Sequence, residues 1–362
     1  MNIAHVLFSF NNGGIENLVV DLLNNWPKKD NLLLCIVNDS YNKKLLKKIN
    51  NNKVKIVCLD RPVGGKNLEY LKQLNLELVN FDAQIVHCHS NNILKFCLPL
   101  KIIHKDWKMI LHIHDAMIYK EISSFDVCIH KIFVSKIIAI SKTVQKSIID
   151  RGMSSKKVVL VYNGIDFSRF NYTRHLSDKK VVLNVARLVP KVKGQDILIK
   201  AISIVNNQLQ ENVYCCLAGG APKEHMDYIV KLRKEVNEYD LNDTVKFLGN
   251  QDNIPYLLSK ANLFVLPSRD EGFGISIVEA MAAKVPVIAS NLEGPREIIG
   301  NNNYGYLFSK NNYQELAHKI EYVLNNDQTA LVEKAYNYAL SHFSIQIMIK
   351  KLSVLYASIL SE

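Results

Sequence analysis

Short apolar runs alternate with segments of helical periodicity along most of the chain. In the first half, apolar runs at residues 3–10, 31–37, 54–59, 83–87, 108–114 and 136–140 predict strands. Between them, residues 15–25, 66–80 and 143–151 have the apolar spacing of amphipathic helices. Strands separated by helices of this length predict βαβ units, and therefore a parallel sheet.

A second block of the same kind follows a change in composition. After an apolar run at 158–162, residues 163–178 are polar and rich in turn formers, and strands are predicted again at 181–186, 213–218, 244–248, 263–266 and 285–289. We therefore predict an α/β protein with two doubly wound, Rossmann-like domains, residues 1–170 and 171–343, that face each other across a cleft. The helical segment 344–362 is predicted to pack back onto the first domain. Ligands of such sheets bind at the carboxyl ends of the strands.

Charge is distributed unevenly between the two halves. The 362 residues carry 45 Lys+Arg and 34 Asp+Glu, a net charge of +11, and residues 1–175 hold 25 of the basic and 14 of the acidic side chains. The whole excess therefore lies in the N-terminal half, which favours a membrane surface or an acidic acceptor over a nucleotide as its sole cause. A nucleic-acid partner is not expected, because no nucleic-acid-binding motif accompanies the charge.

Cysteine usage and hydropathy narrow the class of protein further. The seven Cys are odd in number and include no Cys-x2-Cys pair, which disfavours a disulfide framework or a zinc ribbon and fits the cytoplasm. Residues 1–10 have the pattern of a first strand rather than of a signal peptide. No apolar run reaches the length of about 18 residues that a bilayer span requires.

The most informative segment, residues 266–282, leads from an apolar strand through a glycine turn into a helix. The backbone N–H groups of Phe273, Gly274 and Ile275 would lie at the helix start, where the helix dipole favours an anion. Glu271 precedes the helix and Glu279 lies about one turn inside it. This spacing suits one carboxylate that binds a sugar and another that binds a ribose, with a diphosphate between them.

With this Glu-x7-Glu motif, the sequence resembles the retaining glycosyltransferases of family 4, which have the GT-B fold. The resemblance covers nearly the whole chain in order; it is strong for residues 155–310 and looser for residues 30–135. The other segments that carry it are Gly13-Gly14-Ile15-Glu16, Asn163-Gly164-Ile165-Asp166, Val185-Ala186-Arg187-Leu188 with Lys193-Gly194, Ala218-Gly219-Gly220, Val245-Lys246-Phe247-Leu248-Gly249, Pro286-Val287-Ile288-Ala289 and Pro295-Arg296-Glu297-Ile298-Ile299.

The resemblance implies a role for individual residues in donor binding and catalysis. Arg187 and Lys193 would neutralise the diphosphate leaving group, because fixed cations stabilise the charge that develops on it. Glu271 would bind hydroxyls of the transferred sugar, and Glu279 those of the ribose. Leu248, Gly249 and Asn250 would face the base. The full set of implied donor-binding residues is Gly13, Gly14, Leu248, Gly249, Asn250, Gly272, Phe273, Gly274, Ile275 and Glu279. Because the chain contains no Asp-x-Asp motif, we expect no metal and no other cofactor.

Histidines end two of the predicted strands, at His87 and His89 and at His112 and His114. Strand alternation puts the members of each pair on one face. The resemblance implies that His114 lies near the donor sugar and binds it rather than acting as a nucleophile. A metal site is not expected here, because no carboxylate of suitable spacing accompanies the four side chains. We expect them to be polar residues at the rim of the cleft.

The resemblance implies a retaining hexosyltransferase. The expected donor is a nucleotide sugar, with UDP favoured and a hexose or an N-acetylhexosamine as the sugar. The expected acceptor is a growing, lipid-linked glycan of a bacterial surface, such as O-antigen, capsule or lipopolysaccharide. The family is described by front-face attack, in which a phosphate oxygen takes the acceptor proton. A covalent route would need a carboxylate nucleophile, and the first domain offers only Glu16 and Asp115 near the expected cleft.

Two other activities and a membrane partner are compatible with parts of the sequence. The alternatives are a GDP-mannose-dependent mannosyltransferase and a GT-B sugar-nucleotide epimerase; a dinucleotide oxidoreductase would need a Gly-x-Gly-x-x-Gly loop that residues 11–16 do not supply. The basic amphipathic segment 42–49 and further cations in 93–108 and 131–142 predict contact with anionic lipid. We therefore expect a cytoplasmic protein at the inner face of the cytoplasmic membrane.

Overall fold

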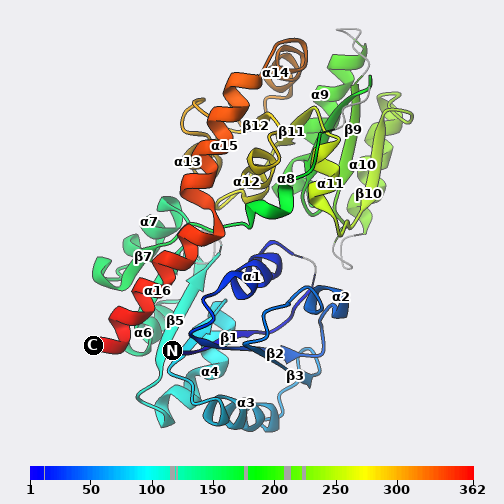
Figure 1. Ribbon diagram of the computed structural model, residues 1–362. Coiled ribbons are helices and arrows are strands. Elements are labelled where there is room, and N and C mark those ends of the chain that lie inside the picture. The colour runs from blue at the N-terminus through cyan, green and yellow to red at the C-terminus, as the bar shows by residue number, and fades with distance from the viewer. Residues whose placement is uncertain (12, 115–118, 120, 175–177, 208–212, 222–225) are drawn as a thin grey trace. The chain divides into compact units, whose positions relative to one another are not determined.

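The computed structural model describes residues 1–11, 13–114, 119, 121–174, 178–207, 213–221 and 226–362. The chain forms two compact units (Figure 1): Met1–Gly164 together with Ile345–Glu362 make up the first, and Ile165–Ser344 makes up the second. The division lies a few residues before the predicted boundary at 170. The reason is that the short helix η2 (Phe167–Phe170) packs against helices of the second unit.

The first unit is built on a seven-stranded parallel sheet with the strand order β3-β2-β1-β4-β5-β6-β7. Its strands are β1 (Asn2–Leu7), β2 (Asn31–Asn38), β3 (Val54–Arg61), β4 (Ile85–Cys88), β5 (Lys108–Ile113), β6 (Lys136–Ala139) and β7 (Val158–Leu160). Its helices are α1 (Gly14–Asn25), α2 (Lys43–Leu46), α3 (Glu69–Asn80), α4 (Asn91–Ile103), α6 (Ser124–Phe133), α7 (Lys142–Asp150), the short η1 (Ser155–Lys157) and α16 (Ile345–Ser361). The predicted strands of this half are all present.

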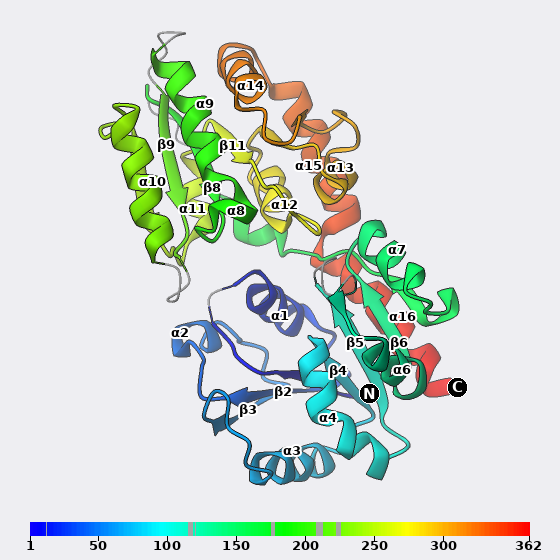
Figure 2. The same ribbon diagram turned by 180° about the vertical axis from the view of Figure 1, so that it is seen from behind.

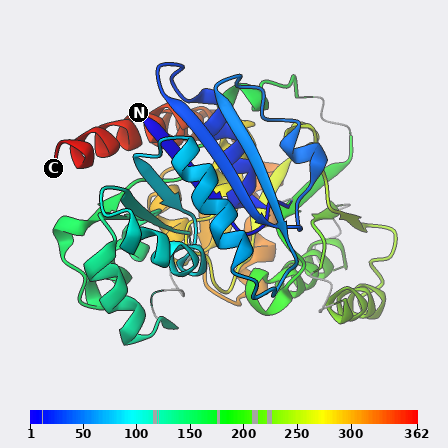
Figure 3. The same cartoon turned by 90° about the horizontal axis from the view of Figure 1, so that it is seen from below.

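Helices cover both faces of this sheet (Figures 1 and 2). The helices α1 and α16 pack together on one face, and α3 and α4 pack together on the other. The last helix contributes seven residues to the buried core beneath α1: Ile345, Met348, Ile349, Leu352, Leu355, Tyr356 and Ile359. The two chain termini lie on the same side of the first unit (Figure 3).

Serine caps start three helices that follow strands of the first sheet. The side chains of Ser90, Ser123 and Ser141 accept hydrogen bonds from backbone N–H groups in the first turns of α4, α6 and α7. A serine in this position satisfies one of the N–H groups that a helix start leaves without a partner. The caps of α4 and α7 fix where the chain turns at the carboxyl ends of β4 and β6.

The second unit is a six-stranded parallel sheet with the order β10-β9-β8-β11-β12-β13. Its strands are β8 (Lys180–Val185), β9 (Val213–Ala218), β10 (Val245–Gly249), β11 (Leu263–Leu266), β12 (Val287–Ser290) and β13 (Tyr306–Phe308). Its helices are α8 (Pro190–Lys193), α9 (Gln195–Asn207), α10 (Asp227–Glu238), α11 (Ile254–Ser259), α12 (Ile275–Ala282), α13 (Glu293–Ile299), α14 (Tyr313–Asn325) and α15 (Thr329–Phe343). The two parallel sheets confirm the predicted doubly wound architecture.

Two elements differ from the sequence-based expectation. Strand β13 was not predicted, because its apolar run, Tyr306–Phe308, spans only three residues, whereas the apolar run 158–162 that contains β7 spans five. The basic segment 42–49 contains only the one-turn helix α2, capped by Asn42 and with Leu45 buried, so it presents no extended amphipathic helix. No helix in the described part of the chain combines the length and apolar character needed to cross a bilayer.

Candidate functional site

A glycine turn joins β11 to α12 in the second unit. Gly274 is the N-cap of α12 with a φ of 98°, a left-handed conformation that side chains other than glycine rarely adopt. Its carbonyl accepts a hydrogen bond from the Ile277 backbone N–H. Gly294, at the start of α13, approaches the turn so closely that a Cβ there would lie 2.6 Å from the Glu271 carbonyl oxygen. The turn is therefore held in one conformation by the next helix.

The end of β8 leads into the short helix α8, which packs against this turn. The Val192 carbonyl accepts hydrogen bonds from the backbone N–H groups of Arg269 and Asp270, at 2.7 and 3.2 Å. Gly194 has a φ of 67°, and a Cβ there would lie 2.0 Å from the Pro267 carbonyl oxygen. The strands β8 and β11 are neighbours in the sheet, so the loops after them meet at one edge.

Lys193 and Glu271 meet across these two loops. The Lys193 Nζ atom lies 2.8 Å from Glu271 Oε2, and the two side chains are 18% and 14% exposed. The hydroxyl of Ser268, which is fully buried, donates a hydrogen bond of 3.2 Å to the same carboxylate oxygen. The structure thus brings together two residues 78 positions apart that the sequence analysis assigned to one site.

A second ion pair fixes the two loops to each other. The Arg269 guanidinium donates to both carboxylate oxygens of Asp196, at 2.7 and 2.6 Å, and to the Pro190 carbonyl at 2.6 Å. The hydrogen bonds to Asp196 raise the pKa of Arg269 above its usual value. A forked pair of this kind is directional as well as strong. The sequence analysis missed this pair and Ser268, because their role depends on contacts between the two loops.

Arg187 lies two residues beyond the end of β8, and its side chain is exposed. No carboxylate of the described residues forms an ion pair with its guanidinium. Its carbonyl accepts a hydrogen bond from the buried Gln195 side chain at 2.9 Å. Arg187 is thus held by its backbone, while its cationic group is available to a ligand.

The ends of β8, β9 and β10 are joined by close glycine contacts. A Cβ at Gly219 would lie 2.0 Å from the Ala186 carbonyl oxygen, and the Gly219 N–H donates to the Gly249 carbonyl at 2.8 Å. A Cβ at Gly220 would meet the side chain of Asn250 at 2.8 Å. Leu248 and Gly249 end β10. The residues predicted to face the base therefore lie two strands from β8 in the same sheet.

The remaining predicted donor residues lie in helices or at their starts. Glu279 is a half-buried residue of α12. In the first unit, Gly13 is the N-cap of α1 and Gly14 its first residue. A Cβ at Gly13 would lie 2.3 Å from a carboxylate oxygen of Glu16. This glycine therefore gives the Glu16 side chain room to fold back over the helix start.

The histidines of the first unit form a cluster of five, because His5 on β1 joins the predicted four. His5 is paired with His87 in the β1–β4 register. His5 Nδ1 lies 3.0 Å from His89 Nε2, and His89 Nδ1 lies 3.4 Å from His114 Nε2. A second series of hydrogen bonds runs through His87, which contacts the Tyr356 hydroxyl of α16 at 2.5 Å and His112 Nδ1 at 3.2 Å. Asp115, the other nucleophile candidate, lies outside the described residues.

Burial keeps these imidazoles neutral. Removal from water lowers the pKa of His5 and of His114 to about 3. The same cause, followed by repulsion from the neighbouring histidines, lowers the pKa values of His87, His89 and His112 well below the usual value. His87, His89 and His112 are at most 5% exposed.

The cluster contains two groups of three histidines whose ring nitrogens lie close together. His5, His87 and His89 form one triad and His89, His112 and His114 another, each with ligand nitrogens within 4.8 Å of one another. Imidazole lone pairs lie in the ring plane and must converge on the ion. The ring of His89 is stacked on those of His87 and His114, at interplanar angles of 15° and 13°, so the ring planes that contain the lone pairs are nearly parallel. The geometry is that of a hydrogen-bonded network.

Two family models match consecutive parts of the chain. The model described as Glycosyltransferase Family 4 matches residues 12–169, and the model described as Glycosyl transferases group 1 matches residues 168–340. Together they cover the chain apart from residues 1–11 and 341–362.

Curated relatives match over part of the chain. An uncharacterized glycosyltransferase of Methanocaldococcus jannaschii is 32% identical over 198 residues, which are 53% of this chain and 50% of that protein. The capsular polysaccharide biosynthesis glycosyltransferase CapM of Staphylococcus aureus is 28% identical over 248 residues, 62% of each chain. The chain thus spans between half and two thirds of the length of these relatives.

A solved structure matches over nearly the whole length. HepE of Anabaena, crystallised in complex with UDP and glucose, has a TM-score of 0.83 at 24% identity and covers 99% of this chain and 100% of its own. At this identity the likeness shows the fold, and both parallel sheets belong to the GT-B architecture.

Proposed function

Since the chain belongs to the group 1 glycosyltransferases, we propose that it transfers a hexose or N-acetylhexosamine from a nucleotide sugar to a growing, lipid-linked glycan of a bacterial surface. The observation that carries this proposal is the contact of Lys193 with Glu271 beside the start of α12. It combines a cation, a carboxylate and the start of a helix at the carboxyl edge of one sheet, where a sugar diphosphate can use all three.

In this proposal, the second unit binds the donor. Lys193, Arg187 and the N–H groups at the start of α12 neutralise the diphosphate. Glu271 accepts hydrogen bonds from sugar hydroxyls and Glu279 from those of the ribose, and the loop at Leu248–Asn250 faces the base. When the diphosphate replaces Glu271 as the ion-pair partner of Lys193, the Glu271 carboxylate can bind the sugar. In the first unit, His114 is neutral and can exchange a hydrogen bond with a sugar hydroxyl.

We propose that transfer retains the anomeric configuration by front-face attack. The acceptor hydroxyl oxygen bonds to the anomeric carbon on the side from which the diphosphate departs, and the bond from that carbon to the phosphate oxygen breaks. The acceptor proton passes to an oxygen of the departing diphosphate. The charge that builds up on this leaving group is stabilised by Lys193 and Arg187, so the route needs no metal ion.

The relatives support a UDP sugar and keep one alternative. HepE is described in complex with UDP and glucose, which favours UDP. A mannosyltransferase of Mycobacterium tuberculosis that is named as GDP-mannose-dependent is 30% identical over 170 residues, so GDP-mannose is the second candidate donor. The role of CapM in capsular polysaccharide biosynthesis supports a surface glycan as the acceptor.

Charge supports a location at the membrane. Residues 1–164 and 345–362 of the first unit carry 25 Lys+Arg and 14 Asp+Glu, whereas residues 165–344 carry 20 of each. The net charge of +11 therefore belongs to the first unit alone. We propose that this unit lies at the anionic inner face of the cytoplasmic membrane.

Release of nucleoside diphosphate from a panel of sugar nucleotides tests the donor. Purified protein is incubated with UDP-glucose, UDP-N-acetylglucosamine and GDP-mannose, with and without a chelator, and UDP or GDP is measured. We expect release from a UDP sugar that Lys193→Ala lowers about 10²- to 10³-fold and that the chelator leaves unchanged. Release from GDP-mannose alone would favour the second candidate. Release from none, with no binding of any nucleotide, would contradict the proposed donor site.

A further inference from the structure

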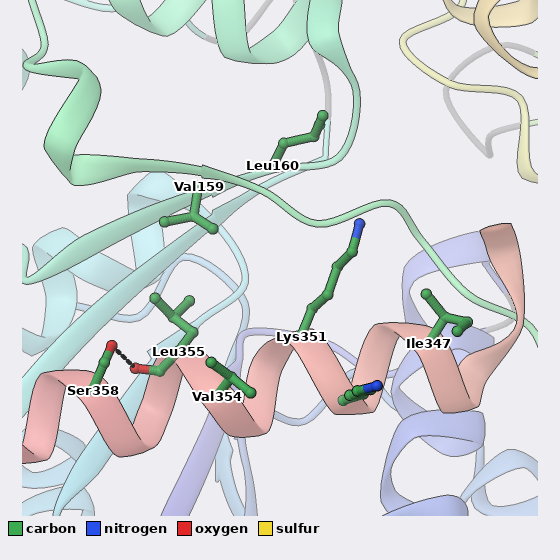
Figure 4. A pocket seen from close by; sticks show the side chains of 8 residues that line it. Val159, Leu160, Ile347, Lys351, Val354, Leu355 and Ser358 are labelled. Carbon is green, nitrogen blue, oxygen red and sulfur yellow. Dashed lines mark hydrogen bonds between the residues drawn. The ribbon is translucent and has the colours of Figure 1, made fainter.

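An apolar groove lies in the first unit between the strand β7 and the helix α16. Its volume is about 520 Å³. The strand β7 is the outermost of the sheet and pairs only with β6, so its other side is open toward the helix. Figure 4 shows Val159 of β7 reaching toward Leu355 of α16 across this space. The lining residues are Val159, Leu160, Ile347, Lys350, Lys351, Val354, Leu355 and Ser358.

The groove floor suits an aliphatic chain rather than a peptide. Among the lining residues, the one neutral polar side chain is Ser358, and its hydroxyl already donates to the Leu355 carbonyl at 2.8 Å. The lining side chains thus offer no neutral group that would recognise a peptide backbone. Val354 is 66% exposed beside the groove, and covering such a side chain with a hydrocarbon chain is favourable.

Cations stand at the same groove. Lys350 and Lys351 are exposed, and neither forms an ion pair with any carboxylate of the described residues. Lys351 Nζ lies 5.4 Å from the ring centre of Tyr162. The side-chain carboxylate of Glu362, the residue after α16, lies 3.3 Å from Lys136 Nζ and is therefore already neutralised. The apolar lining of the groove suits an aliphatic chain, and the two lysines without an ion pair to any described carboxylate suit an anionic head group. Together they suit an amphiphile that carries both.

A second copy of this chain fits the groove poorly. In a symmetric dimer the same patch of both copies is buried. Lys350 and Lys351 would then approach the same cations of the partner copy, and like charges in an interface repel. The net charge of +11 on this unit adds to that repulsion and attracts anionic lipid.

We propose that the groove between β7 and α16 binds one acyl chain of an anionic glycerophospholipid, with Lys350 and Lys351 at its phosphate. The site holds the first unit at the bilayer surface. It is independent of the donor chemistry, which rests on the second unit, so either proposal can fail without the other.

Vesicle sedimentation tests the groove with the full chain. Partition coefficients are measured on vesicles of phosphatidylcholine alone and of phosphatidylcholine mixed with phosphatidylglycerol. We expect binding only to the anionic vesicles, about 30-fold weaker for Lys350→Gln/Lys351→Gln, because each lysine near the surface contributes about fivefold. Val354→Asn should weaken binding roughly tenfold, because an apolar contact is lost.

Matched variants on the second unit control for charge and polarity. Lys234→Gln/Lys310→Gln removes two exposed cations, and Val230→Asn replaces a valine that is 68% exposed on α10. Both should bind vesicles like the unchanged protein. Circular dichroism checks that all variants keep their helical content and melting temperature.

Three outcomes would overturn the proposal. Equal binding to both kinds of vesicle, or none, removes the anionic lipid. If the lysine variant loses vesicle binding and Val354→Asn does not, general charge attraction explains the binding and the groove takes no part in it. A concentration-dependent dimer that Val354→Asn dissociates in sedimentation velocity, without lipid, would assign the groove to a second copy.

Discussion

Lys193 Nζ lies 2.8 Å from Glu271 Oε2, and this ion pair joins the loop after β8 to the loop after β11. Each partner holds the other in place while no ligand is bound. A diphosphate that binds Lys193 must replace the carboxylate as its counter-ion. The pair therefore couples the binding of the leaving group to the freeing of the residue proposed to bind the sugar.

Replacing Lys193 by Ala should lower turnover about 10²- to 10³-fold, because it removes a cation aimed at the charge that develops in the transition state. Lys191→Ala is the matched control, since Lys191 lies on the same helix α8 and is exposed. The measurement is nucleotide release under saturating donor. Near-normal turnover of the Lys193→Ala protein would contradict the assignment.

Ser268→Ala should weaken catalysis without unfolding the site. The hydroxyl donates one hydrogen bond to Glu271 Oε2, and loss of a bond to a charged group costs about 1.5–3 kcal/mol. We expect kcat/KM to fall roughly tenfold to 100-fold, with the melting temperature close to that of the unchanged protein. Ser203→Ala, whose hydroxyl bonds only the Lys200 carbonyl on α9, should leave kcat/KM unchanged. An unchanged kcat/KM for Ser268→Ala would show that Glu271 does not depend on this bond.

A nucleoside diphosphate should stabilise the second unit. A ligand that binds only the folded state adds about 2.7 kcal/mol at a concentration 100 times its Kd. We expect UDP to raise the midpoint temperature of the calorimetric transition in which the second unit unfolds. Lys193→Ala should reduce this shift. Both Trp residues, Trp26 and Trp107, lie in the first unit, so tryptophan fluorescence identifies the other transition. A shift confined to the transition seen by fluorescence would contradict a donor site in the second unit.

Alanine substitution at two glycines distinguishes the cost of backbone strain from the cost of a steric clash. Gly194 and Gly249 have nearly the same φ, 67° and 65°, but a Cβ at Gly194 meets the Pro267 carbonyl oxygen at 2.0 Å and a Cβ at Gly249 meets no atom within 4 Å. Gly249→Ala should therefore lower the free energy of unfolding by about 1–2 kcal/mol, the cost of a left-handed alanine. Gly194→Ala should lower it by several kcal/mol more. Equal losses in calorimetry would show that the two loops can separate freely.

Stability of the first unit should increase with pH below 6.5. The pKa of His5 is about 3 in the folded protein and about 6.5 in the unfolded chain. Below pH 6.5 the unfolded state therefore binds more protons, and the stability that this histidine contributes at neutral pH is lost as pH falls. Each such histidine lowers the free energy of unfolding by about 1.4 kcal/mol per pH unit.

Urea unfolding at pH 7.5 and at pH 5, followed by tryptophan fluorescence, measures this dependence in the first unit. His5→Asn should reduce the slope by the share of one histidine. The exposed His318 on α14 offers a control, since His318→Asn should not change it. If the free energy of unfolding of the first unit is the same at both pH values, the histidines of the cluster are not buried in the neutral form.

The sequence predicted most of the fold because the strands are continuous apolar runs. Every strand that the sequence analysis proposed is present, with ends displaced by a few residues at most. Strand β13 escaped because its apolar run spans only three residues, and its place depends on pairing with β12. The domain boundary moved because residues 167–170 pack by tertiary contact rather than by any local signal.

The candidate site was predicted where chemistry and spacing coincide. Lys193 and Glu271 were chosen by motif, and they touch. Arg269 and Asp196 were not, because a salt bridge between two loops has no signature in either loop alone. His5 was missed for a similar reason: β1 and β4 are adjacent in the sheet but far apart in the chain. An even spacing within one strand can be read from sequence, whereas neighbours across strands require the topology.

The placement of α16 has a consequence for the order in which the protein is made. The core of the first unit contains seven residues of this helix, including Tyr356, which bonds His87. Residues 1–164 leave the ribosome first but cannot close that core until residues 345–362 have been synthesised. The second unit, one continuous stretch of chain, can fold while the first still waits. During translation the N-terminal unit is thus the last to be completed, and a nascent chain that stalls before α16 exposes an open apolar face to chaperones.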